Sequence, residues 1–335
     1  MSTQPSSWPS ADAESSARAP GHRAGAAEPL VSVIIPTYKR AEFLDRAIES
    51  ALAQSYRPVE VIVVEDGSHD AEAVVSRYGD RVRYIWQENQ GAAVSRNTGA
   101  AVAHGSWLAM LDDDDVWFPE KLDRQLALLR RFPSLGFIHS NYYWLRNGVA
   151  EPRPDTRADS IPSGWITEEL VLARFSIATS TVLVRADAFR RVGGFNPGYR
   201  YVQDYDLWVR LSLVCQFGYL ATPLAYYQAD APEDRAVVLR KALTNVDILH
   251  RFVETNRYLC RTWPQPLLRG RFHLVHLRCA QRHLWADEVE TARAHFLKAW
   301  TWSPSRLSAL AYGLACMTGR RGIRALRAMF RSAPR

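Results

Sequence analysis

Hydrophobic residues between positions 31 and 111 follow two alternating patterns. Short, continuous apolar runs rich in Val and Ile are typical of buried strands, and each is followed by a polar residue or by Pro. Between these runs, apolar residues recur at the spacing of one helix face, as Leu44, Ile48 and Ala51 do. The pattern predicts strands at Val31–Ile35, Val59–Val64, Val82–Trp86 and Trp107–Leu111, separated by helices at Ala41–Gln54, Ala71–Tyr78 and Gly91–His104.

Continuous apolar strands separated by helices indicate the α/β class. The expected architecture is a mostly parallel, Rossmann-like sheet with helices on both faces. Ligands of such sheets bind outside the carboxyl ends of the strands. Polar clusters directly follow three of the expected strands, at Thr37–Arg40, Glu65–Ser68 and Asp112–Asp115. The sheet therefore predicts a site where these clusters meet.

The run Asp112–Asp115 places four carboxylates next to one another at the end of an apolar strand. Their mutual repulsion is offset by a bound divalent cation, and Mg²⁺ and Mn²⁺ prefer oxygen ligands. Mg²⁺ is often held by one or two carboxylates together with substrate phosphates. Taken alone, the run also fits a solvated turn that caps a helix beginning near Pro119. The neighbouring clusters favour a metal–diphosphate site.

Asp66 and Arg96 are the strongest candidates in the other clusters. Asp66 precedes Gly67, so its carboxylate either accepts hydrogen bonds from a base or ribose or belongs to an ordinary Asp-Gly turn. Arg96 lies in a helix of small residues, where it either binds a phosphate bidentately or is simply exposed. No GxGxxG follows the first strand and no GxxxxGK[ST] is present, which excludes dinucleotide-binding and P-loop motifs.

A further constellation lies at Gly193–Phe195 and Gln203–Leu207. Asp204 and Asp206 are expected to open a helix, where carboxylates are stabilised by the helix dipole. Alternatively, one of them is a general base directed at a substrate hydroxyl. The residues alone leave these two interpretations open.

In this order, the segments resemble the family-2 inverting glycosyltransferases, which have the GT-A fold. The resemblance covers about residues 29–228. Any one motif is weak, but five in the same order are specific. The motifs are Ser32–Tyr38, Val63–Ser68, Asn89–Gly99, Leu111–Asp115, and Gly193–Phe195 followed by Gln203–Leu207.

The resemblance implies a role for each matched residue. Asp204 matches the catalytic base. Asp112 and Asp114 match the DxD motif, with Asp114 as the direct ligand of Mg²⁺ or Mn²⁺. Asp115 is expected to lie toward the sugar, and Glu65 replaces a commoner Asp. The donor nucleotide is expected to contact Pro36, Thr37, Tyr38, Asp66, Arg96, Asp112 and Asp113.

The implied activity is metal-dependent transfer of a sugar, with inversion, from a nucleotide-sugar, commonly a UDP-sugar. The expected acceptor is a hydroxyl of a glycan or lipid-linked molecule in cell-surface polysaccharide or glycolipid biosynthesis. One alternative is an inactive nucleotide-binding scaffold. The other is a sugar nucleotidyltransferase, although Pro36–Arg40 stands where those enzymes have a glycine-rich loop.

Composition adds limits on partners and location. The 335 residues carry a formal charge of +7, which favours anionic partners, but dispersed basic residues argue against nucleic acid. Four widely spaced cysteines indicate a reduced, cytoplasmic protein. No apolar run is long enough for a transmembrane helix. Residues 1–28 lack the apolar core of a signal peptide and are expected to be a disordered tail.

The expected domains are a catalytic region at 29–230 and a helical region at 231–335. In the last segment, Arg320, Arg324, Arg327 and Arg331 share one helical face, opposite Ile323, Leu326, Met329 and Phe330. Such a basic amphipathic helix either contacts the inner face of the cytoplasmic membrane or packs on the domain. Earlier helices are expected at Ala236–Asn256, Leu267–Trp285, Ala286–Trp300 and Ser305–Met317.

Overall fold

The computed structural model describes residues 28–153, 161–229, 234–318 and 322–324. The expected tail at 1–28, apart from Glu28, lies outside the described residues, as does most of the expected basic helix at 320–335. The chain divides into two compact units. The first holds the sheet and its helices, and the second holds Glu168–Arg174 together with the C-terminal helices.

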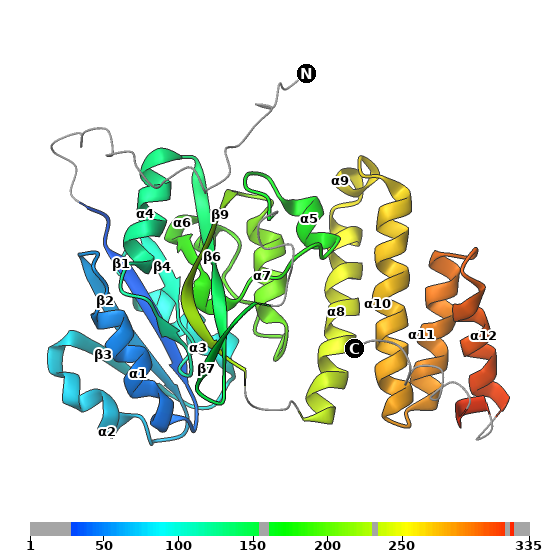
Figure 1. The fold of residues 1–335 in the computed structure, drawn as a ribbon, viewed down its shortest axis with the longest axis horizontal. Helices are drawn as coiled ribbons and strands as arrows, with labels where there is room; N and C mark the ends of the chain where they lie inside the picture. The colour runs from blue at the N-terminus through cyan, green and yellow to red at the C-terminus, as the bar shows by residue number, and fades with distance from the viewer. Residues whose placement is uncertain (1–27, 154–160, 230–233, 319–321, 325–335) are drawn as a thin grey trace. The chain divides into compact units, whose positions relative to one another are not determined.

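The first half of the sheet has the predicted parallel α/β arrangement (Figure 1). Its strands lie in the order β3-β2-β1-β4, and each pair within this group is parallel. This arrangement confirms the predicted fold class. The elements are β1 (Val31–Thr37), α1 (Ala41–Leu52), β2 (Val59–Asp66), α2 (Glu72–Val75), β3 (Val82–Gln87), α3 (Ala92–Val102) and β4 (Trp107–Met110).

Most of the predicted elements begin or end one or two residues from the expected positions. The strand β1 continues through Pro36 to Thr37. Its pairing with β4 ends at Ile34, so Pro36 borders only β2 and its missing N–H removes no bond to β4. The helix predicted at Ala71–Tyr78 is instead the short α2 followed by a 3₁₀ turn, Ser76–Arg81.

Helix α3 packs closely on the sheet because it contains Gly99. A Cβ atom at Gly99 would lie 2.6 Å from the Cγ2 atom of Ile34 in β1. The opposite face of β1, with Val33 and Ile35, belongs to a core that also includes residues of α1. The small residues of α3 therefore bring Arg96 close to the strand ends.

The second half of the sheet is mixed and was not predicted. Both β8 and β7 are antiparallel to β6, whereas β9 runs parallel to β6. The full strand order is β3-β2-β1-β4-β8-β6-β9-β5, with β7 paired to β6. The elements are β5 (Val116–Trp117), α4 (Lys121–Arg131), β6 (Leu135–Arg146), β7 (Val149–Pro152), β8 (Leu183–Arg185), α6 (Ala186–Arg191), α7 (Gln203–Leu211) and β9 (Gln216–Gln228).

The direction in which the chain builds the sheet reverses between β1 and β4. From β1 the chain proceeds outward to β2 and β3, and then returns to place β4 on the other side of β1. In open α/β sheets such a reversal opens a crevice at the carboxyl ends of the two strands. Here β1 ends at Thr37, and β4 leads into Asp112–Asp115.

The second unit is helical, in agreement with the prediction. Its longer helices α8, α10, α11 and α12 lie side by side in this order (Figure 1). Among the described residues, no helix combines the length and apolar character needed to cross a membrane. The helices are α8 (Arg235–Thr255), α9 (Arg257–Arg261), α10 (Gln265–Trp285), α11 (Val289–Trp302) and α12 (Leu307–Ala315), followed by the 3₁₀ turn Cys316–Thr318.

Candidate active site

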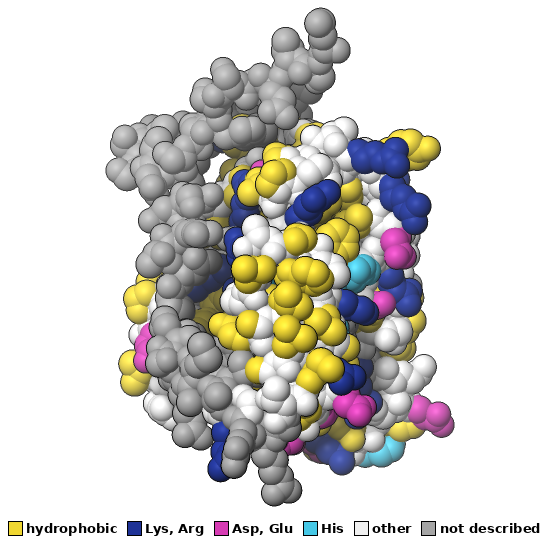
Figure 2. Space-filling model, turned by 90° about the vertical axis from the view of Figure 1, so that its right-hand side faces the viewer, with side chains coloured by type: hydrophobic (Ala, Val, Ile, Leu, Met, Phe, Trp, Pro, Cys, Tyr) yellow, Lys and Arg dark blue, Asp and Glu magenta, His cyan; other side chains and the backbone are white. Residues whose placement is uncertain are grey.

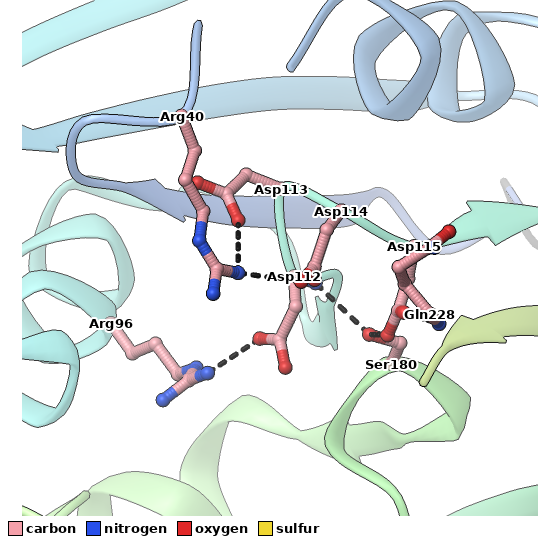
Figure 3. A network of polar contacts seen from close by, with 8 residues as sticks. All are labelled: Arg40, Arg96, Asp112, Asp113, Asp114, Asp115, Ser180 and Gln228. Atoms are coloured by element: carbon pink, nitrogen blue, oxygen red, sulfur yellow. Dashed lines mark hydrogen bonds and ion pairs between the residues drawn. The ribbon is translucent and has the colours of Figure 1, made fainter. Parts of the chain in front are cut away.

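The acidic run after β4 is opposed by two arginines from different elements (Figure 3). Arg40, in the loop after β1, places its Nη1 atom 2.5 Å from Oδ2 of Asp114 and 3.6 Å from Oδ1 of Asp113. Arg96 of α3 is buried, and its Nη2 atom lies 2.5 Å from Oδ1 of Asp112. The like charges of the run are therefore offset by cations that the fold brings from β1 and α3.

Asp113 and Asp114 nevertheless have pKa values above the usual range of a carboxyl group. Burial raises the pKa of Asp113 to about 7, although the Thr37 hydroxyl and the Arg40 cation lower it. Burial and the charge of Asp112 raise the pKa of Asp114 against the opposing effect of Arg40. Because a divalent cation favours the ionised forms, its binding would relieve this cost.

Ser180 holds the acidic run in place through hydrogen bonds to two of its residues (Figure 3). The sequence analysis did not identify this residue. Its Oγ atom accepts a hydrogen bond of 3.0 Å from the amide of Asp112 and donates one of 2.5 Å to Oδ2 of Asp115. The other oxygen of Asp115 accepts a 2.8 Å bond from the amide of Gln228, at the end of β9. Ser180 thus sets the path of the backbone between Asp112 and Asp115.

This geometry corrects the expectation for Asp115. The residue was expected to lie toward the sugar, but it is 1% exposed and binds Ser180 and Gln228. Burial and the charges of Asp112 and Asp114 raise its pKa well above the usual range. Asp115 therefore holds the loop together, whereas Asp112 and Asp114 remain partly exposed.

A second buried layer holds Ser180 in turn. Its carbonyl oxygen accepts a 2.6 Å bond from Nε1 of Trp117, and the carbonyl of Thr181 accepts one of 2.8 Å from Gln125. The ammonium of Lys121 donates to Gln125 at 2.9 Å and lies 4.0 Å from the centre of the Trp117 ring. Burial lowers the pKa of Lys121 well below its usual value.

The carboxylates at the end of β2 organise a turn. The carboxylate of Asp66 accepts bonds of 2.9 and 2.8 Å from the amides of Gln90 and Gly91, and another of 2.8 Å from the side chain of Gln87. Asp66 therefore fixes the start of α3. Glu65 is buried and bonds to Tyr84, Ser68 and two backbone amides; although burial raises its pKa, these bonds hold the pKa below its usual value.

The remaining predicted nucleotide contacts lie near the end of β1. Pro36 and Thr37 are buried, whereas Tyr38 is 40% exposed. Their contact with a nucleotide stays a prediction, as does that of Asp66.

Arg96 also links α3 to the segment after α6. Its guanidinium carbon lies 5.3 Å from the centre of the Phe195 ring. The side-chain amide of the neighbouring Asn97 donates a 2.8 Å hydrogen bond to the carbonyl of Phe195 and accepts one of 2.9 Å from its backbone N–H. With its amide oriented to satisfy both ends, Gln203 accepts a 3.2 Å bond from Nη1 of Arg96. One arginine thus connects the acidic run, the Gly-Gly-Phe segment and the start of α7.

The two carboxylates at the start of α7 have different surroundings. Asp206 binds Arg210 through Nε at 2.9 Å and Nη2 at 2.6 Å. Asp204 accepts a 2.8 Å bond from the amide of Tyr205. Burial and the charge of Asp112 raise the pKa of Asp204, while the Tyr205 amide and the Arg96 cation lower it. Asp204 is therefore within electrostatic reach of the acidic run, whereas Asp206 stabilises its own helix.

The start of α7 is also conformationally strained. Val202, directly before it, has a φ of 60° and a ψ of 19°, in the left-handed region. A β-branched residue seldom adopts this conformation, which persists where the surroundings enforce it. The strained residue lies two positions before Asp204, so its backbone conformation sets the direction in which α7 begins and thereby the position of Asp204.

The predicted metal site is supported by the type of ligand atoms present, not by a complete set of protein ligands. Within the described ranges, no three or more His, Cys, Asp or Glu side chains converge as a metal-binding group. Asp112 and Asp114 nevertheless offer the hard oxygen ligands that Mg²⁺ and Mn²⁺ prefer. A cation held there would take further ligands from water or from substrate phosphates.

Comparison with known sequences finds that this region is similar to glycosyltransferases. A family model described as glycosyl transferase family 2 matches residues 32–186. An uncharacterized glycosyltransferase of Rickettsia prowazekii, RP339, is 34% identical over 192 residues, covering 54% of this chain and 58% of the relative. The chondroitin synthase of Escherichia coli is 29% identical over 205 residues, which cover 57% of this chain and 28% of that protein. The matched part thus spans little more than half of the first relative.

Solved structures share the fold at low sequence identity. TarS of S. aureus (residues 1–349), in complex with UDP-GlcNAc, has a TM-score of 0.54 and 16% identity, covering 81% of this chain and 91% of that one. The Pyrobaculum calidifontis mannosyltransferase PcManGT, in complex with GDP-Man and Mn²⁺, has a TM-score of 0.56 and 19% identity, covering 90% and 84%. These likenesses support the GT-A-type architecture.

Proposed function

We propose, on the premise that residues 32–186 form a family-2 glycosyltransferase domain, that the chain transfers a sugar from a nucleotide-sugar to an acceptor hydroxyl with inversion. One observation carries the proposal. Arg96 pairs with Asp112 and also lowers the pKa of Asp204, so one donor-side carboxylate and the candidate base share the influence of one cation.

In this proposal the donor diphosphate lies at the crevice between β1 and β4. Asp114 and Asp112 would hold Mg²⁺ or Mn²⁺, which, when bound, neutralises negative charge on the departing nucleoside diphosphate. Arg40 and Arg96 are cations at the same edge, and each can bind phosphate oxygens. Pro36, Thr37, Tyr38 and Asp66 would surround the nucleotide.

Asp204 is the proposed general base. Its carboxylate accepts the proton of the acceptor hydroxyl as that oxygen attacks the anomeric carbon from the face opposite the leaving group. The bond to the nucleoside diphosphate breaks as the new glycosidic bond forms, so the anomeric configuration inverts. A raised pKa suits this role because a base closer to neutral accepts protons more readily.

The donor is proposed to be a UDP-sugar, and the acceptor a glycan or lipid-linked molecule of cell-surface polysaccharide or glycolipid synthesis. TarS was solved with UDP-GlcNAc and PcManGT with GDP-Man, so both bases belong in the test. A contact between residues 320–335 and an anionic membrane at the cytoplasmic face stays a prediction, because most of that segment lies outside the described residues.

A thermal-shift panel tests the donor site first. UDP, GDP and their sugar conjugates are compared, each with Mn²⁺ and with EDTA. We expect a metal-dependent rise for one base, largest with one sugar, because only the bound state gains that stabilisation. NMR of the product made with that donor should show the inverted anomer. Metal-dependent binding without turnover on any glycan acceptor would indicate a scaffold, and a retained configuration would exclude Asp204 as the base of a single displacement.

A further inference from the structure

Helix α12 is unusual because it has no charged side chain. The segment from Leu307 to Thr318 contains no Asp, Glu, Lys, Arg or His. In a water-soluble fold, a helix that is apolar on every side is normally buried on every side. The surroundings of α12 should therefore show what covers each of its faces.

The inner face of α12 is covered by α11. Ala309, Gly313 and Cys316 are buried there. A Cβ atom at Gly313 would lie 3.1 Å from Leu297 of α11, and the ring of Tyr312 meets that of Phe296 edge to face at 5.6 Å. This packing accounts for one side of the helix.

The outer face of α12 is exposed. Leu307 and Leu314 of α12 are 66% and 51% exposed, and Met317 of the following 3₁₀ turn is 63% exposed. Their spacing of seven and three residues is that of one stripe. Figure 2 shows hydrophobic side chains gathered on this face, with basic side chains at the margin. In the row α8-α10-α11-α12, α12 has no further helix beside this stripe among the described residues.

The described part of the following segment turns to the other side. Ile323 packs with Tyr312 and Ala315 against the inner cluster that contains Leu284 and Phe296. At this point, therefore, the chain adds to the inner core and leaves the outer stripe open.

The charge of this part of the chain indicates what kind of surface could cover the stripe. Residues 231–335 contain 19 Lys and Arg against 7 Asp and Glu, whereas residues 1–230 contain 23 against 28. Arg306 directly precedes α12, and Arg320 and Arg321 follow it. A second copy docked through the same face would bring two strongly basic regions together, which like charges disfavour. An anionic partner has the opposite sign.

We propose that the outer face of α12 inserts into the interface of an anionic lipid membrane. Leu307, Leu314 and Met317 would lie at the boundary between headgroups and acyl chains, where buried apolar area stabilises the contact. The basic residues around them would pair with lipid phosphates. The proposal does not depend on the glycosyltransferase activity and assigns to a described helix a contact that the sequence suggested only for residues 320–335.

Flotation of the full chain with lipid vesicles tests the proposal. Vesicles of phosphatidylcholine and phosphatidylglycerol in equal parts are compared with pure phosphatidylcholine. We expect wild type to float with the anionic vesicles and Leu314→Glu to bind about tenfold more weakly, because one leucine loses its burial and gains a charge. Leu314→Phe, which keeps the apolar surface, should bind as wild type does.

Tyr258→Glu is the matched control, since Tyr258 is 85% exposed on α9 and the substitution adds the same charge. Its binding should stay within about twofold of wild type, because Tyr258 lies on α9, outside the proposed contact, and the membrane surface potential falls off within a Debye length. Far-UV circular dichroism confirms that each variant is folded. Three outcomes would overturn the proposal: no flotation of wild type, an equal loss for Leu314→Glu and Tyr258→Glu, or a dimer in light scattering that Leu314→Glu dissociates.

Discussion

The acidic run Asp112–Asp115 and a row of three histidines, His250, His276 and His295, are both clusters of titratable side chains, one in each unit. In the row, Nε2 of His276 lies 3.1 Å from Nε2 of His250, and its Nδ1 lies 2.9 Å from Nδ1 of His295. A neutral imidazole donates through one nitrogen and accepts through the other, so His276 can satisfy both of its nitrogens with its two neutral neighbours. The central ring of the row therefore needs no ligand.

Burial acts on both clusters in the same physical sense, because it disfavours the charged form. It lowers the pKa of His276 to about 3 and that of His295 to about 4, while nearby His250 and Lys298 act in the same direction. In the acidic run burial raises the pKa values of Asp113, Asp114 and Asp115, while arginines pair with the two partly exposed carboxylates, Asp112 and Asp114. A titratable cluster is thus a candidate ligand site when its side chains stay charged and partly exposed. When burial makes its side chains neutral, the cluster belongs to the core.

The largest effect is expected from Asp204→Asn, which tests whether the region around the acidic run is catalytic. The substitution removes the proposed base while keeping the shape of its side chain. We expect kcat to fall by about 10²- to 10⁴-fold, with donor binding in the thermal-shift assay retained. Because the pKa of Asp204 is raised, wild-type kcat should fall with decreasing pH at a higher pH than an ordinary carboxylate would give. Asp206→Asn is the control. It breaks the bond to Arg210, costs about 1 kcal/mol of stability and leaves kcat near wild type.

Asp114→Asn tests whether the acidic run binds a divalent cation. The metal-dependent part of donor affinity should fall by at least about a hundredfold, because loss of an outer-shell partner alone costs 10- to 100-fold. Without metal, the variant should be as stable as wild type or more so, since one of several like charges has been removed. Titration calorimetry with Mn²⁺ and the nucleotide measures the first effect and urea unfolding the second. Asp123→Asn, at an exposed carboxylate of α4, should change neither, and unchanged Mn²⁺ dependence in Asp114→Asn would reject the assignment.

Ser180→Ala tests how far the acidic run depends on the layer beneath it. The substitution leaves the amide of Asp112 and the buried carboxylate of Asp115 without their shared partner. We expect a loss of about 1–3 kcal/mol in the free energy of unfolding and about tenfold weaker metal-dependent donor binding. Ser140 supplies the control, because it is a buried serine whose hydroxyl has no partner among the described residues. Ser140→Ala should be neutral in both assays, and an equal effect of the two substitutions would assign Ser180 to packing alone.

The parallel half of the fold was predictable because its signals are local. The strands β1 to β4 are short, largely apolar runs, and each polar cluster lies at or just after the end of one. The strands β5 and β8 contain two and three residues, too few to show a period, and they are defined by pairing with distant segments. The role of Ser180 likewise depends on contacts that span 65 and 68 positions of the chain.

One feature of the site could have been found from spacing. Asp206 and Arg210 are four residues apart in an expected helix, a separation that favours ion pairing. That spacing already distinguishes Asp206 from Asp204, which has Trp208 four residues later, while Arg200, four residues earlier, precedes the expected helix. The strain at Val202 and the burial of Asp115 have no such local signature, because tertiary packing imposes them.

The smallest effect is expected in the histidine row, where function should not change at all. A histidine whose pKa is lowered by folding is neutral in the native state, so the unfolded chain binds more protons below about pH 6.5. Its stabilising contribution is present above that pH and is lost as the pH falls toward the folded-state value. With a folded pKa of about 3 for His276, one such residue lowers the free energy of unfolding by up to about 2 kcal/mol between pH 7 and pH 5.

His276→Gln keeps a donor and an acceptor but cannot titrate, so urea unfolding, followed by far-UV circular dichroism, should show a smaller decrease over this range. His104→Gln, at an exposed histidine paired with Glu60 in the first unit, should keep the wild-type decrease in the helical unit. If His276→Gln retained the full pH dependence, the row would be charged in the native protein and would resemble the acidic run after all.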